Sequence, residues 1–189
     1  GITCLDAGAT GITVHPRPDQ SHIRASDITP LSALCRSRKV EFNIEGNPFA
    51  AELADYPGFI ALVEAACPEQ VTLVPDDNDQ LTSDHGFNLN ISGAELKPLI
   101  QHFQKLGIRV SLFMDPNIEQ ISLAKAIGAD RIEFYTGPYA LAHKLGSNKL
   151  ESIFEEYRSA AEHAHNIGLE LNAGHDLNLD NLSRFLTIP

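Results

Sequence analysis

The sequence predicts a parallel α/β fold in which short apolar strands alternate with amphipathic helices. Four helix-like segments close on a glycine and are followed at once by a strand-like run, at residues 7–14, 105–113, 126–134 and 166–173. Glycine just past a helix end supplies the left-handed conformation of a C-cap. The short β-branched run after it is typical of a buried parallel strand. Strict alternation of the two element types favours a parallel sheet with right-handed crossovers.

Two further strands are predicted at 39–45 and 70–75, which makes six in chain order. Amphipathic helices are predicted at 95–106, 118–127 and 151–167. Residues 76–92 form an unusually long loop after the third strand, and long loops in compact domains usually bind or cover a ligand. We expect a lid there, with a solvated excursion as the alternative.

Polar residues follow nearly every predicted strand, and this pattern favours a barrel. In chain order they are His15, Glu45, Pro75, Asp115, Glu133 with Thr136, and Asn172 with His175. A (β/α)8 barrel brings all its strand ends to one site, whereas a doubly wound sheet uses one switch point. The glycine-rich nucleotide motifs of doubly wound folds are absent from the sequence. We therefore predict one incomplete barrel domain over residues 1–189, about two strands short of the typical ~250 residues.

Composition narrows the choice of partners and of cellular location. The net charge of -11 argues against nucleic acid, which binds to basic surfaces. It leaves phosphorylated metabolites open, because backbone N–H groups at helix N-termini bind anions at any net charge. The sequence has no bilayer-length apolar run and no signal-peptide pattern, so we expect a soluble, cytoplasmic protein without a membrane partner. We expect the scattered Cys4, Cys35 and Cys67 to be small buried hydrophobic residues in a reducing compartment.

The stretch GITVHPRPDQSHI, residues 11–23, places His15 at a strand end, followed by Arg17 and His22. An imidazole both takes and gives a proton near neutral pH. The guanidinium and the second imidazole on the same loop could bind a phosphate group. Pro16 and Pro18 restrict the backbone and stiffen this loop. The alternatives are a hydrogen-bonded core histidine for His15 and solvated loop charges for the other two.

Two carboxylates and a second histidine lie at other strand ends. Glu45 and Glu133 end otherwise apolar strands, as catalytic groups or as members of buried ion pairs. His175 follows Ala-Gly, which permits close approach of the backbone, and we expect it to lie across from His15. Two imidazoles and a carboxylate form an acid–base set for carbonyl chemistry. A metal site of His15, Glu45 and His175 competes with this interpretation, but the sequence has no short-spaced ligand pair, so we predict no metal.

Six segments together resemble the pyridoxine 5′-phosphate synthase family of the vitamin B6 pathway. They are GITVHPRPDQSHI, FNIEGN, VTLVPDDNDQLTSDHG, IRVSLFMDP, IEFYTG and LELNAGHDLNLDNL. The resemblance implies a (β/α)8 barrel of which strands two to seven are present, and a cytoplasmic homo-oligomer, an octamer in the family. It implies no metal or organic cofactor. The implied reaction condenses 3-amino-2-oxopropyl phosphate (aminoacetone phosphate) with 1-deoxy-D-xylulose 5-phosphate and gives pyridoxine 5′-phosphate, phosphate and water.

The resemblance also implies roles for individual residues. His15 matches the proton-accepting histidine, Glu45 the catalytic glutamate and His175 the proton-donating histidine. The substrate-binding positions are Arg17, His22 and Thr82, with Glu133 as a further active-site carboxylate and Asp176 at a backbone contact to substrate.

The family's first-strand Asn-x-Asp-His motif and its Gly-His segment after the eighth strand are not among these residues. We therefore expect a chain shortened from a longer protein. The alternatives are an inactive barrel fragment that serves as an interaction module, and another barrel enzyme of phosphorylated metabolites, such as a metal-dependent epimerase or aldolase.

Overall fold

The computed structural model describes residues 1–21, 23–76 and 82–189, which divide into two compact units. The first unit holds residues 1–83 and 99–111, and the second holds residues 84–98 and 112–189. The expectation of a single domain over residues 1–189 stays a prediction.

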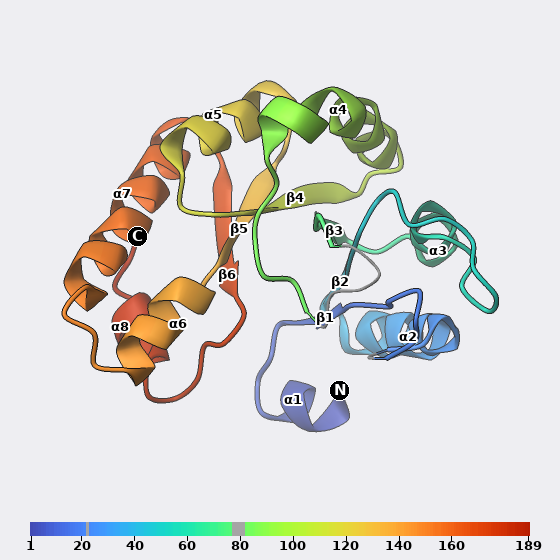
Figure 1. The fold of residues 1–189 in the computed structure, drawn as a ribbon. Coiled ribbons are helices and arrows are strands. Elements are labelled where there is room, and N and C mark those ends of the chain that lie inside the picture. The colour runs from blue at the N-terminus through green and yellow to red at the C-terminus, as the bar shows by residue number, and fades with distance from the viewer. Residues whose placement is uncertain (22, 77–81) are drawn as a thin grey trace. The chain divides into compact units, whose positions relative to one another are not determined.

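Six strands follow one another in the sheet in the order of the chain (Figure 1). They are β1 (Gly11–Val14), β2 (Glu41–Gly46), β3 (Gln70–Leu73), β4 (Arg109–Met114), β5 (Arg131–Tyr135) and β6 (Glu170–Gly174). β1 pairs with β2, β2 with β3, and β5 with β6, all in parallel. Each strand ends at most one residue beyond its predicted segment. The predicted α/β class, with parallel strands in the chain order of a barrel, is confirmed.

Helices alternate with these strands along the chain, and three of them were predicted by range. They are α1 (Ile2–Asp6), the 3-10 helix η1 (Ala25–Asp27), α2 (Ile28–Arg38), α3 (Phe59–Ala66), α4 (Leu89–Lys105), α5 (Ile118–Ala126), α6 (Gly137–Lys144), α7 (Leu150–Asn166) and α8 (Leu182–Phe185). The predicted helices correspond to α4, α5 and α7. Among the helices in the described ranges, none has the length and apolar character needed to cross a membrane.

The expected lid at residues 76–92 differs from the structure at one end. α4 begins at Leu89, so the last four residues of the expected loop are helical. Residues 77–81 lie outside the described residues. The lid itself therefore stays a prediction.

In the first unit, α2 packs against β1, β2 and α3 (Figure 1). The register places Thr13 beside Asn43, whose side-chain amide donates to Thr13 Oγ1 at 3.1 Å and to Thr72 Oγ1 at 3.0 Å. Successive side chains of a strand point to opposite faces, so residues two apart share a face. The face that carries Thr13 and Asn43 therefore also carries the positions of His15 and Glu45.

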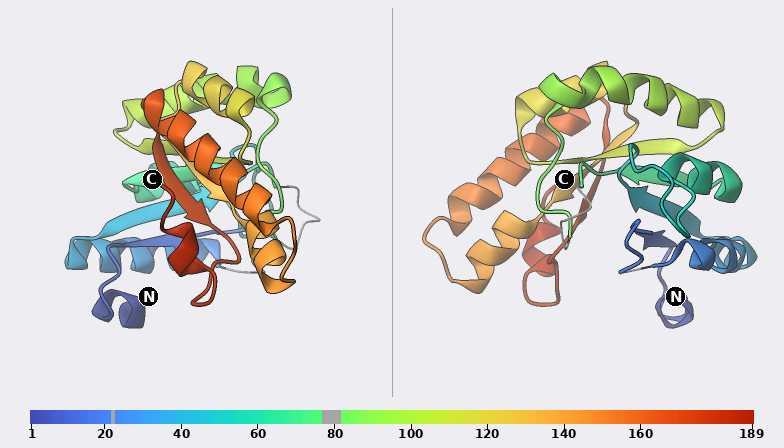
Figure 2. Two further views of the ribbon diagram at one scale, coloured as in Figure 1. Left: turned by 90° about the vertical axis from the view of Figure 1, so that its left-hand side faces the viewer. Right: turned by 45° about the vertical axis from the view of Figure 1, so that its right-hand side comes forward.

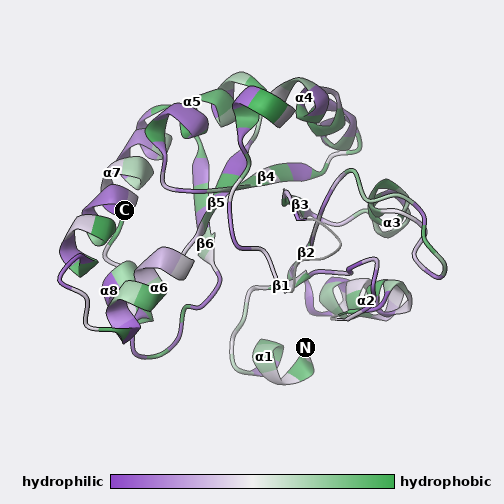
Figure 3. Cartoon of the chain, viewed as in Figure 1, coloured by the Kyte–Doolittle hydropathy of each residue, from purple (hydrophilic) through white to green (hydrophobic). Residues whose placement is uncertain are grey.

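In the second unit, α7 packs along β6 and contacts α5 and α6 (Figure 2). Its polar and apolar residues alternate around the helix (Figure 3). The buried side chains recur at helical spacing: Phe154, Tyr157, Ala160, Ala161 and Ala164. Tyr157 packs edge-on against Phe134 of β5 and donates its hydroxyl to the carbonyl of Tyr135 at 2.5 Å. This packing fixes the position of the end of β5, close to the candidate site residues Glu133 and Thr136.

The predicted glycine C-caps are present. Gly107 and Gly128 have φ values of 79° and 101°, in the left-handed region where a side chain would be strained.

The prediction that the three cysteines are buried is wrong at two of the three positions. Cys35 is buried, and burial raises the pKa of its thiol. Cys4 and Cys67 are exposed. Cys67 is the C-cap of α3, and a helix end at the surface leaves its side chain in solvent.

Candidate active site

Two predicted site residues of the first unit lie in direct contact. His15 directly follows β1 and Glu45 lies near the end of β2, on the same face of neighbouring parallel strands. His15 Nδ1 is 3.2 Å from Glu45 Oε1. Glu45 is 5% exposed, so the contact is largely shielded from water. A buried carboxylate against an imidazole is an arrangement suited to general acid–base chemistry.

A second carboxylate, Asp76, joins this group after β3. It is 5% exposed, and its Oδ2 accepts from Arg17 Nη1 at 3.3 Å and from Ser83 Oγ at 2.8 Å. The same oxygen lies 3.8 Å from His15 Nε2. The sequence did not single out Asp76, because it opens an acidic loop that is typical of solvated chain. The only signal was its place just after a strand end.

One oxygen of Asp76 is unusual. Oδ1 is buried and accepts no hydrogen bond from any residue in the described ranges. A buried acceptor without a donor costs about 1–3 kcal/mol, and such groups call for an explanation by water, ligand or function. Asp76 lines a small cavity together with His15, Arg17, Asn47 and Tyr56.

The predicted phosphate-binding loop is only partly described. Arg17 is 2% exposed, and its Nε lies 3.6 Å from Asp19 Oδ1 in addition to the contact with Asp76. Pro16 forms a parallel β-bridge with Ile23, and this bridge joins the start of the loop to its end. Thr82 is exposed, next to Ser83. His22 lies outside the described residues.

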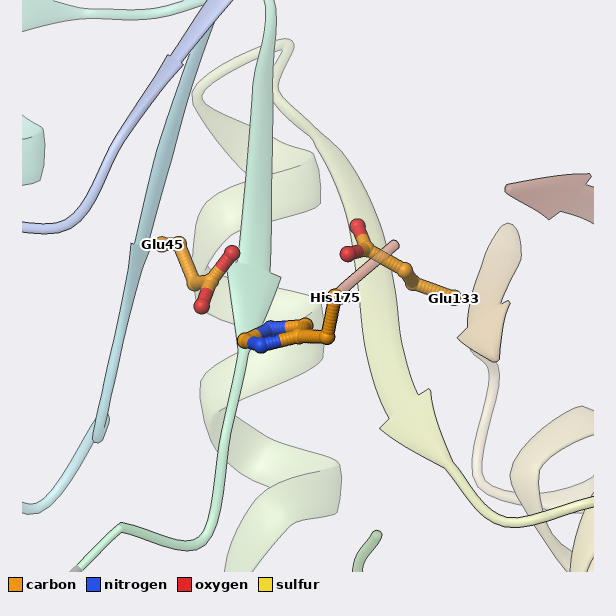
Figure 4. A group of neighbouring side chains, drawn as sticks. All are labelled: Glu45, Glu133 and His175. Carbon is orange, nitrogen blue, oxygen red and sulfur yellow. The ribbon is translucent and has the colours of Figure 1, made fainter. Parts of the chain in front are cut away.

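The second unit brings Glu133 and His175 together (Figure 4). Glu133 is an 8% exposed residue of β5, and one of its carboxylate oxygens lies within 4.8 Å of a ring nitrogen of His175. Gly174 is the last residue of β6 and directly precedes His175. Its missing side chain leaves space for the Glu133 carboxylate, because a Cβ there would lie 2.5 Å from Glu133 Oε1. The close approach that the Ala-Gly pair permits is therefore made by the Glu133 side chain. Figure 4 also draws Glu45, which belongs to the first unit.

The backbone after β6 takes an uncommon conformation. His175 and Asp176 have φ values of 74° and 57°, and left-handed residues other than glycine cost of order 1–3 kcal/mol each. Thr136 Oγ1 donates to the carbonyl of Gly174 at 2.5 Å and also to that of His175. Asn181 Nδ2 donates to the carbonyl of Asp176 at 3.1 Å. These bonds hold a strand exit that sterics alone disfavour, and strain of this kind is common at functional sites.

Tyr135 is a further polar group of the second unit that the sequence did not single out. Its ring packs edge-on against His175, with centroids 6.0 Å apart. Burial, together with the carboxylates of Asp176, Asp84 and Asp115, raises the pKa of its hydroxyl. The group therefore stays protonated at neutral pH and can donate a hydrogen bond. An aromatic residue inside a strand is usually core, so only the structure could identify it.

Tyr135 also lines a cleft of about 960 Å³ in the second unit. Asp176, Lys144 and His143 line the same cleft, which therefore presents groups of both charges. Its volume is in the range of small-molecule sites.

The other described histidines are at or near the surface. His102, His143, His163 and His165 are all at least partly exposed. His102 contacts Glu64 at 2.7 Å, and His85 contacts the neighbouring Asp84 at 2.6 Å.

Comparison with known proteins gives matches over nearly the whole chain. The family model "Pyridoxal phosphate biosynthesis protein PdxJ" matches residues 1–189. Pyridoxine 5′-phosphate synthase of Xanthomonas campestris pv. campestris (strain B100) is 56% identical over 184 residues, which are 97% of this chain and 71% of that protein. The enzyme of the same name from Xylella fastidiosa (strain M23) is 53% identical over 183 residues, covering 97% and 70%.

Among solved structures, the YdjI aldolase of Escherichia coli K12 is similar with a TM-score of 0.50 at 11% sequence identity. The match covers 87% of this chain and 64% of the aldolase chain. At this identity the likeness concerns the fold alone, and it agrees with the α/β barrel class.

Proposed function

Because the chain belongs to the pyridoxine 5′-phosphate synthase (PdxJ) family of vitamin B6 biosynthesis, we propose in detail how its residues perform the synthase reaction. The substrates are 3-amino-2-oxopropyl phosphate and 1-deoxy-D-xylulose 5-phosphate, and the products are pyridoxine 5′-phosphate, phosphate and water. The observation that carries the proposal is the buried contact of His15 with Glu45 at neighbouring strand ends. It supplies a proton-transfer pair where a barrel enzyme has its site.

His15 acts as the proton acceptor and Glu45 as the catalytic carboxylate beside it. The substrate amine attacks a ketone and loses water to form an imine. A proton then leaves the carbon next to the imine, and phosphate departs. Each step requires a proton to be taken or given near neutral pH, and a histidine with an adjacent carboxylate can do both.

His175 acts as the proton donor, with Glu133 as the further carboxylate of the site. Their proximity within the second unit, and the left-handed strand exit that holds His175, support this role. Ring closure on the second carbonyl requires an acid to protonate the departing oxygen. Tyr135, whose ring packs against His175, adds a neutral hydroxyl donor to the second unit.

Arg17, His22 and Thr82 bind the phosphorylated substrates, and the backbone at Asp176 contributes a further contact. A planar guanidinium matches the geometry of phosphate oxygens, which supports Arg17 in this role. The phosphorylated substrates also agree with the family of the chain.

The experiment is to supply both phosphorylated substrates and to measure pyridoxine 5′-phosphate and inorganic phosphate, with each substrate omitted in turn. We expect both products only when both substrates are present, and the same rate after chelation of metals. Loss of turnover on chelation would favour a metal-dependent barrel enzyme instead. Formation of neither product would favour a barrel that serves as an interaction module.

A further inference from the structure

We infer that Asp76 is a positioning residue that holds His15 and Arg17 for the reaction; this inference rests on the proposed function. The three residues follow two strands of the first unit: His15 and Arg17 follow β1, and Asp76 follows β3. Glu45 lies on β2, the strand between them. The Asp76 carboxylate is 5% exposed. Its Oδ2 is the common partner of the Arg17 guanidinium, the Ser83 hydroxyl and the edge of the His15 ring.

The His15 ring has a carboxylate at each nitrogen. Glu45 Oε1 lies 3.2 Å from Nδ1, and Asp76 Oδ2 lies 3.8 Å from Nε2. A neutral imidazole donates from one nitrogen and a protonated imidazole from both. Carboxylates on both sides can therefore hold the ring in one orientation while a proton arrives and leaves. Since 3.8 Å exceeds hydrogen-bond length, Asp76 acts on the ring through its charge.

Asp76 is itself fixed from several directions. Ser83 Oγ donates to its side chain at 2.8 Å, and Asn47 Nδ2 donates to its backbone carbonyl at 2.8 Å. Its buried Oδ1, which no described residue satisfies, is a feature that stability alone would not favour. A catalytic group must be held within about 0.5 Å of its productive place by supporting contacts of this kind.

The test is the Asp76→Asn variant, in which an amide of the same size still accepts from Ser83 but lacks the charge. We expect kcat to fall at least tenfold, because the charge beside the His15 ring is lost, and KM for the phosphorylated substrates to rise, because Arg17 loses its buried ion pair. Asp19→Asn is the matched control, because it removes an exposed carboxylate that also lies near Arg17. Its kcat should stay within threefold of the wild type.

A spectroscopic measurement gives a second readout that does not depend on turnover. The ¹⁵N signals of the His15 ring, assigned by their loss in His15→Gln, should shift in Asp76→Asn and stay in place in Asp19→Asn. Should Asp76→Asn fail to fold, Ser83→Ala removes one hydrogen bond to Asp76 and keeps its charge. That variant should lower kcat by between two- and tenfold at a temperature well below its melting transition, where the protein is still fully folded.

A wild-type kcat in Asp76→Asn would overturn the inference. If Asp76→Asn does not fold, a wild-type kcat in Ser83→Ala would overturn it. Unshifted ring signals in Asp76→Asn, or an equal loss of kcat in Asp19→Asn, would also overturn it. These results differ from a failure of the proposed function, in which the wild-type protein itself forms no pyridoxine 5′-phosphate.

Discussion

At the scale of single residues, the proposed chemistry depends on polar side chains that the fold buries. The sequence could predict that His15 and Glu45 share a site, because both lie at strand ends and side chains in strands alternate with a period of two. It could not predict that Asp76 or Tyr135 joins a site. An acidic residue in a loop is usually exposed to solvent, and an aromatic residue in a strand usually belongs to the core. Only the tertiary contacts show that these two residues lie in a site.

Burial also predicts how stability depends on pH. Tyr56 is 1% exposed, and burial raises the pKa of its hydroxyl to about 12. The folded protein therefore keeps this proton while the unfolded chain loses it near pH 10. The stabilisation is fully present below pH 10 and is lost as pH rises toward 12, by about 3 kcal/mol in total.

We expect Tyr56→Phe to remove this part of the alkaline loss. Between pH 9 and pH 11.5, the free energy of unfolding should fall by about 2 kcal/mol less in the variant than in the wild type. Urea titrations at both pH values measure it. Equal losses in the two proteins would contradict the assignment to Tyr56.

At the scale of elements, the strands were predictable because glycine C-caps and apolar runs are local signals. The start of α4 was not. Its first five residues include Asn90 and Gly93, which are poor helix formers. The N–H of Leu89 donates to Gln120 Oε1, far away in sequence. A helix end stabilised by a distant side chain leaves little trace in the local sequence.

The pair of β5 and β6 gives a test at this scale. In Gly174→Ala, the new methyl group would lie 2.5 Å from Glu133 Oε1 and must displace that carboxylate. We expect kcat to fall at least tenfold. The control is Gly11→Ala in β1, where the Cβ would come no closer than 3.2 Å, to the carbonyl oxygen of Glu41, and turnover should stay near wild type. Normal kcat in Gly174→Ala would argue against a catalytic role of Glu133.

At the scale of the whole molecule, the barrel class was predictable because chemically capable residues follow most of the strands. The division into two compact units left no signal in composition or spacing. Cytoplasmic location and assembly into a homo-oligomer stay predictions, because they depend on surfaces and signals that the strand pattern does not report.

The predicted assembly has a direct measurement. Light scattering coupled to size-exclusion chromatography should give eight times the chain mass of 20.6 kDa, if the family's octamer extends to this protein. A mass equal to one chain across the micromolar range would contradict the predicted homo-oligomer.

The central claim is that the contact between His15 and Glu45 transfers protons in pyridoxine 5′-phosphate synthesis. The most direct test is the kcat of Glu45→Gln, which keeps the side-chain shape and removes the charge, measured beside Glu41→Gln. Glu41 lies on the same strand, is half-exposed and pairs with Arg109. The account predicts a fall of at least a hundredfold in Glu45→Gln and a kcat within twofold of wild type in Glu41→Gln, both with folded protein. Near-normal turnover in Glu45→Gln would contradict it.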